Sequence, residues 1–175
     1  MSTSFEFTDP RHFVAGAVGE PGQRVFYLQT SQDSEVVSLK MEKQQVQALA
    51  QFLGSVLEDL PAPAAPVAAA ELVEPIEPLW VVGQIAVGID EAESRIVLVL
   101  EELVLEDEDD DDLDEITEDF FEDITLGARL RLHITSAQAQ AFIKQSETLM
   151  SAGRPPCRLC GQPDGRGGHI CPRLN

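Results

Sequence analysis

The sequence predicts an α+β fold in which two β-meander-plus-helix halves are followed by a C-terminal zinc-binding tail. Short apolar runs of strand length occur in two groups, and each group precedes a segment with the 3–4 spacing of a buried helix face. All three cysteines of the chain lie in its last 19 residues. With 175 residues, 43% of them hydrophobic, the chain can bury one core. We therefore expect one domain and an appended tail.

Residues 1–60 contain the first predicted meander and helix. A turn is expected at Gly19-Glu-Pro21-Gly22, because Pro followed by Gly favours a type II turn. The predicted strands span residues 4–8, 12–19, 24–29 and 35–41. The helix that follows carries one apolar face, made of Val46, Leu49, Ala50, Leu53, Val56, Leu57 and Leu60. It is expected to stop at Pro61.

The second half, residues 79–152, follows a segment of residues 61–78 that contains five prolines and six alanines and predicts a flexible or partly extended linker. A helix is expected from the capping-box spacing of Thr135-Ser-Ala-Gln138 to the break at Gly153. The predicted strands of this half span residues 79–89, 95–104 and 128–134.

The two halves also correspond in sequence. A shift of 93 positions places Leu39 on Leu132 and Gln45 on Gln138. We interpret this as a degenerate duplication. The other interpretation is that any strand followed by a helix shares such periodicity.

Charge is concentrated in one insertion, residues 101–123. It holds 15 of the 31 acidic residues, no Lys or Arg, and most of the formal net charge of −19. Self-repulsion predicts an extended, solvated segment, although Phe120-Phe121 leaves open a partner-binding role. Nucleic-acid binding by the body is disfavoured, because it requires a continuous basic face.

The chain shows neither a signal peptide nor an apolar stretch long enough for a membrane span. Cysteines gathered at metal spacing fit a reducing compartment better than a disulfide framework does. A cytoplasmic location is therefore expected.

The tail, residues 153–175, carries four metal-ligand candidates: Cys157, Cys160, His169 and Cys171. A C-x2-C knuckle followed by H-x-C offers the donors of a tetrahedral Zn2+ site. Haem attachment fails because Gly161 stands where the motif needs histidine, whereas a redox C-x2-C pair remains an alternative. Four protein ligands leave no position for water, so the expected Zn2+ is structural rather than catalytic.

No catalytic motif is apparent outside the tail. The sequence lacks a P-loop, a G-x-G-x-x-G turn, a G-x-S-x-G elbow and an H-E-x-x-H helix. His12 and His133 are interpreted as structural, with His133 pointing off the apolar face of its strand. Arg24 and Arg95, each at a strand start, are the candidate anion contacts.

The chain resembles a conserved, uncharacterised family of high-GC Gram-positive bacteria. The likeness rests on the turn Val18-Gly-Glu-Pro-Gly-Gln-Arg24 together with the tail from Ala152-Gly-Arg-Pro-Pro-Cys157 to Cys171-Pro-Arg-Leu-Asn175. Gly165-Arg-Gly167 departs from the Asp-Pro step of relatives. The resemblance implies genomic association with a histidine-phosphatase-like protein and a phosphatidylinositol-kinase-like protein, but no assigned activity.

Three functions remain open at the level of sequence. The first is a non-enzymatic zinc-binding interaction or scaffold protein. The second is an enzyme or ligand-binding protein that uses a groove between the two halves. The third is a transcription-linked or nucleic-acid-linked module.

Overall fold

The computed structural model describes residues 3–63, 65–68, 70–104 and 127–153, together with Cys157, Leu159, Cys160, Cys171 and Arg173 of the tail. Within these residues the strands are β1 Phe5–Phe7, β2 His12–Val18, β3 Val25–Gln32, β4 Glu35–Met41, β5 Pro78–Asp90, β6 Arg95–Glu102 and β7 Arg129–Ile134. The helices are α1 Lys43–Glu58 and α2 Ser136–Ser151. The predicted α+β class is thus confirmed.

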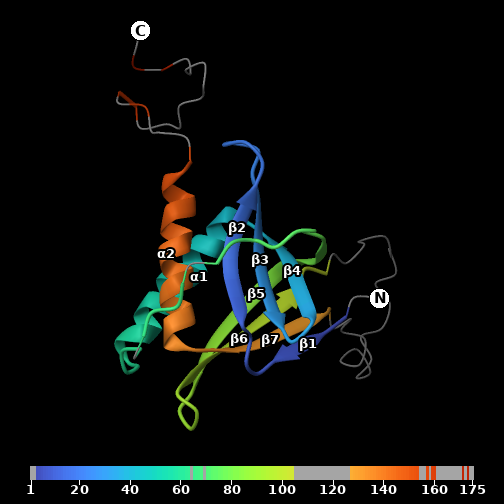
Figure 1. The fold of residues 1–175 in the computed structure, drawn as a ribbon. Coiled ribbons are helices and arrows are strands. Elements are labelled where there is room, and N and C mark those ends of the chain that lie inside the picture. Colours follow the sequence, from blue (N-terminus) through green and yellow to red (C-terminus); the bar gives the residue numbers. More distant parts are fainter. Residues whose placement is uncertain are drawn as a thin grey trace, which may run out of the picture.

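All described strands belong to one sheet, with the order β1-β7-β6-β5-β4-β3-β2. Strands β2, β3 and β4 form one antiparallel meander, and β5, β6 and β7 form another. The two meanders join through a parallel pairing of β4 with β5. Helices α1 and α2 lie against each other beside the sheet (Figure 1). Each half therefore contains a three-stranded meander followed by a helix, and the first half has the additional strand β1, which pairs with β7. An origin by duplication stays a prediction.

The core lies between the sheet and the two helices. Strands β6 and β7 follow a period of two, in which alternate side chains are fully buried: Ile96, Leu98, Leu100, Leu130, Leu132 and Ile134. The ring of Phe13 on β2 stacks on Phe142 of α2 at a centroid distance of 4.8 Å. The helix that ends the second half therefore packs on the first strand of the first meander, β2.

Local sequence signals account for the turn between β2 and β3 and for the start of α2. Gln23 N donates to Glu20 O (2.9 Å), and Gly22 at the third turn position has φ 98°, as a type II turn requires. At the start of α2, Gln138 N donates to Thr135 Oγ1 (3.2 Å) and Thr135 N donates to Gln138 Oε1 (2.9 Å). The predicted type II turn and capping box are both confirmed.

Strand β3 extends three residues beyond the predicted end at Gln29. Gln29 and Thr30 are fully buried although both are polar. The apolar run ends before them, so hydrophobicity gives no signal there. Partners elsewhere satisfy them: Thr30 Oγ1 donates to His12 O (2.8 Å), and Gln29 contacts Ser38 and Val73.

The described residues of segment 61–77 form neither helix nor strand, yet part of this segment is fixed to the sheet. Val73 N donates to Gln29 Oε1 (2.7 Å), and Val73 O accepts from Gln29 Nε2 (2.9 Å). Leu72 covers Gly16 of β2 so closely that a Cβ there would overlap the leucine side chain. The connection between the halves is thus anchored at Leu72 and Val73.

Two predicted features lie wholly or partly outside the described residues. The acidic insertion is described only at residues 101–104, where Arg129 Nη2 contacts Glu101 Oε1 (2.7 Å). His169 of the tail also lies outside them. Neither helix of the described part is long and apolar enough to span a membrane.

Candidate metal centre

The structure brings together the three cysteines predicted to bind metal. Their Sγ atoms all lie within 4.8 Å of one another, and Cys171 is only 4% exposed. None of the three forms a disulfide. Three clustered thiols can hold a soft or borderline metal ion. The fourth predicted ligand, His169, is outside the described residues.

The separation of two of these sulfurs fits a shared metal ion better than a disulfide between them. Cys157 Sγ and Cys171 Sγ are 3.9 Å apart. Two sulfurs bound tetrahedrally to one Zn2+ at about 2.3 Å would be about 3.8 Å apart. A disulfide would require about 2.05 Å. The sulfurs therefore stand at the spacing of two neighbouring ligands.

The knuckle also favours the thiolate form of its first cysteine. Hydrogen bonds from the backbone at Cys160 and then Leu159 lower the pKa of Cys157 to about 7. Backbone N–H donors stabilise a charged sulfur, and the thiolate is the form that binds metal. Arg173 Nη1 donates to Leu159 O (3.0 Å), so the residue two positions after Cys171 is tied to the knuckle.

Comparison with known proteins places the whole of this architecture in one family. The model of a family described as "Protein of unknown function (DUF3090)" matches residues 5–171. The chain belongs to the DUF3090 family. The match covers the sheet, both helices and all four predicted metal ligands, so body and tail form one family unit. No curated protein and no solved structure matches the chain.

The two arginines predicted as anion contacts occupy different parts of this DUF3090 protein. Arg24 precedes β3 and lines a hollow of about 270 Å³ together with Lys43 and Gly153. Arg95 begins β6, and its guanidinium contacts Asp9 Oδ1 (3.1 Å) and His133 O (3.4 Å). The β2–β3 turn and the β5–β6 turn lie at opposite ends of the molecule (Figure 1). The structure thus does not join the arginines in one site, and anion binding by either stays a prediction.

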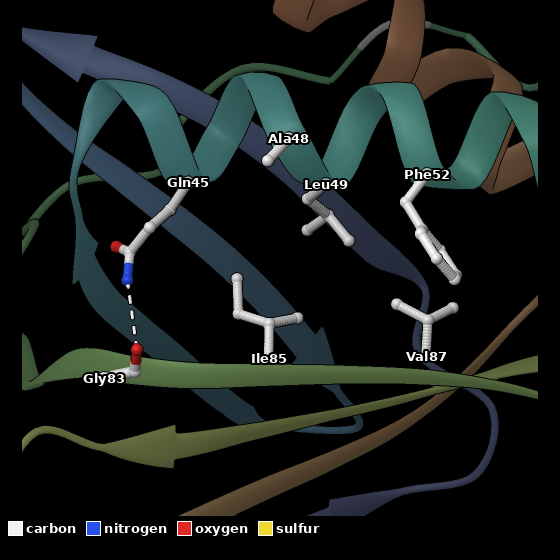
Figure 2. A pocket seen from close by; sticks show the side chains of 7 residues that line it. All are labelled: Gln45, Ala48, Leu49, Phe52, Gly83, Ile85 and Val87. Atoms are coloured by element: carbon white, nitrogen blue, oxygen red, sulfur yellow. Dashed lines mark hydrogen bonds between the residues drawn. The ribbon is translucent and has the colours of Figure 1, made fainter.

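A groove does lie where the two predicted halves meet, between α1 and β5. Figure 2 shows Ala48, Leu49 and Phe52 of α1 facing Ile85 and Val87 of β5. The groove between them has a volume of about 300 Å³. The amide of Gln45 closes one end by donating to Gly83 O (3.4 Å) and Val82 O (2.9 Å). Neither candidate arginine lines this groove. Its apolar walls suit an apolar ligand rather than an anion.

Sequence reasoning missed one further group of metal-ligand side chains. Asp90, Glu93 and His133 present ligand atoms that all lie within 4.8 Å of one another. Short motif spacing cannot reveal this cluster, because about 40 residues separate the histidine from the two acids. Only the pairing of β5 with β6 and of β6 with β7 brings them together.

Proposed function

We propose that this DUF3090 protein is a non-enzymatic zinc-binding interaction protein. Cys157, Cys160, His169 and Cys171 hold one structural Zn2+, and the metal orders the tail as a docking module beside the body. The observation that carries the proposal is the clustering of the three sulfurs with a 3.9 Å separation between Cys157 and Cys171. A fourth donor, His169, completes the coordination and leaves no open position for a reacting water.

The metal assignment is tested by elemental analysis of protein purified under reducing conditions. We expect one equivalent of zinc per chain in the wild type and strong loss in Cys160→Ser. The matched control is Leu159→Ser, which places the same new side chain one position away on a residue that is half exposed and offers no ligand. Well under one equivalent in the wild type, or equal zinc in both variants, would contradict the proposal.

Partner binding is tested separately. The family resemblance points to a phosphatidylinositol-kinase-like or histidine-phosphatase-like protein, in the cytoplasm, as the partner. We expect a complex between purified proteins that weakens in Cys160→Ser and is retained in Leu159→Ser. Binding of neither candidate by zinc-loaded wild type would contradict the docking role while leaving the metal assignment intact.

The groove between α1 and β5 favours a second candidate function, the binding of a small apolar ligand. Its walls are aliphatic and aromatic, and its polar residue Gln45 is already bonded to β5. Ala48→Trp would fill the groove from a side chain that faces it (Figure 2). We expect this variant to abolish binding of an uncharged fluorescent apolar probe such as Nile red. Unchanged probe binding would remove this function.

We also infer that the two halves arose by duplication of a three-strand-plus-helix unit. Two residues at the 93-position shift, Gln45 and Gln138, support this inference. Each donates from Nε2 to a backbone carbonyl of the other half, Gln45 to Val82 and Gln138 to Pro10. A family-wide comparison in which the two glutamines vary without relation to each other would contradict it.

A further inference from the structure

A second cluster of metal-ligand side chains lies on the face of the sheet that α1 and α2 leave uncovered. Asp90 ends β5, Glu93 lies in the four-residue turn that follows, and His133 lies on β7. Strand β6 runs between them, and its Val97 pairs with both Gly88 and His133. Gly88 has no side chain, and a Cβ there would meet nothing within 4 Å. The imidazole and the two carboxylates can therefore meet above β6.

The histidine of this cluster carries a buried nitrogen without a hydrogen-bond partner in the described part of the chain. His133 Nε2 is buried and has no hydrogen-bond partner among the described residues. The nearest ion-pair partner, Glu6 Oε1, is 4.0 Å away, which exceeds hydrogen-bond distance. Buried polar atoms without partners are rare and call for an explanation such as a bound ion. A metal ion shared with the two carboxylates would satisfy Nε2.

The acidic side of the cluster is held in position by its own turn. Asp90 Oδ1 accepts from Ala92 N (3.0 Å) and Glu93 N (3.3 Å), which fixes the carboxylate and the backbone that carries Glu93. Hydrogen bonds of this kind orient metal ligands in known sites. The neighbouring cation, Arg95, is engaged by Asp9 at 3.1 Å. The guanidinium is therefore directed to another carboxylate.

We propose that Asp90, Glu93 and His133 bind a divalent first-row transition-metal ion, and that the juxtaposition of two carboxylates with an imidazole that carries an unsatisfied buried nitrogen defines the site. One nitrogen and two oxygen donors suit Mn2+, Fe2+, Co2+ or Zn2+, whereas Ca2+ and Mg2+ prefer oxygen ligands alone. The ion would tie the β5–β6 turn to β7. Three protein ligands leave at least one coordination position for water or for a donor from another molecule.

Cobalt(II) provides a test in the full-length protein, because it reports the two sites through different signals. Thiolate ligation in the tail gives an intense charge-transfer absorption, while a site of nitrogen and oxygen donors does not. We compare wild type with Glu93→Gln, His133→Gln and the matched control Glu91→Gln. Glu91 lies in the same turn but outside the cluster, so its variant removes the same charge without removing a ligand.

We expect wild type and Glu91→Gln to bind one more equivalent of Co2+ at equilibrium dialysis than Glu93→Gln and His133→Gln. The Co2+-induced rise in Tm should be smaller by roughly 5–10 °C in these two variants when Co2+ is 100-fold above the Kd of the site. The thiolate absorption should be equal in all four proteins.

Equal Co2+ binding by all four proteins would overturn the proposal. A loss in Glu91→Gln as large as that in Glu93→Gln would also overturn it, because the binding would then depend only on the charge of the turn. Circular dichroism of the metal-free proteins checks folding. If His133→Gln does not fold, Glu93→Gln, which changes an exposed turn residue, decides the question. Failure of the tail site would appear separately, as absence of the thiolate band.

Discussion

Replacing Gln29 by leucine should destabilise the protein strongly, because this fully buried amide joins β2, β4 and the segment that connects the two halves. Its Nε2 donates to Ser38 Oγ (3.0 Å) and Val73 O (2.9 Å), and its Oε1 accepts from Val73 N (2.7 Å). His12 Nε2 lies 3.1 Å from the same oxygen. Leucine fills similar volume but offers none of these bonds, so the effect isolates the loss of hydrogen bonding.

The expected loss of stability depends on which hydrogen-bond partners of Gln29 stay buried in the variant. Ser38 is 4% exposed and His12 is partly buried, so each loses a partner that water replaces poorly. An unsatisfied buried group costs about 1–3 kcal/mol. Val73 is 52% exposed, and its backbone groups can turn to water at little cost. The free energy of unfolding should therefore fall by about 2–6 kcal/mol.

Urea unfolding followed by circular dichroism measures this change, with Gln44→Leu on the exposed face of α1 as the matched control. The control should stay within about 0.5 kcal/mol of wild type. In a double-mutant cycle, Ser38→Ala should cost less in the leucine background, because the serine has already lost its partner. A loss below about 1 kcal/mol for Gln29→Leu, or strict additivity in the cycle, would refute the reasoning.

Three other predictions concern single groups. In metal-free protein, the rate of alkylation of Cys157 should rise with pH and show a midpoint near pH 7, because its pKa is lowered to about 7. A midpoint near the ordinary thiol pKa of 9.0 would contradict stabilisation of the thiolate by the backbone. Burial lowers the pKa of His12 below 6.5, so the unfolded state binds a proton at a higher pH than the folded state does. The stability contribution of His12 should be full above pH 6.5 and should decrease as the pH falls towards the folded pKa. His12→Asn should lessen that dependence in urea unfolding at several pH values, and an unchanged slope would contradict it. Thr135→Ala should cost about 0.5–2 kcal/mol through loss of the N-cap bond, whereas Thr148→Ala on the exposed face of α2 should be nearly neutral; equal effects would contradict the cap.

The sequence was most informative where side-chain burial repeats with a fixed period. Alternation along β7 places Leu130 and Leu132 in the core and His133 on the opposite face, as predicted. A strand that is buried on one face alternates apolar and polar residues. Its sequence pattern therefore predicts which side chains are buried. The β2–β3 turn and the cap of α2 could also be predicted, because Pro21 and Thr135 act through neighbours only a few residues away.

The features that the sequence did not predict depend on contacts between segments that are distant in the chain. Strand β1 was expected, but nothing local indicates that Phe5 pairs in parallel with Leu130 of β7. Gln29 gives no sign of burial, because its partners Ser38 and Val73 become neighbours only after folding. The Asp90 cluster arises in the same way. Tertiary contacts determine which polar groups are buried together, and no sequence periodicity indicates those contacts.

The tail differs from these cases because its candidate ligands are close in sequence. The number of sulfurs helps to distinguish metal binding from a redox thiol pair. A redox pair needs two thiols, and a disulfide between Cys157 and Cys160 would leave Cys171, which is only 4% exposed, without a bond partner. A lowered Cys157 pKa favours either chemistry and so does not discriminate. Metal binding would use all three sulfurs at once, and it would account for the 3.9 Å separation of Cys157 and Cys171, which form no disulfide. On this reasoning, oxidation should compete with metal, so zinc-loaded protein should resist disulfide formation and chelated protein should not.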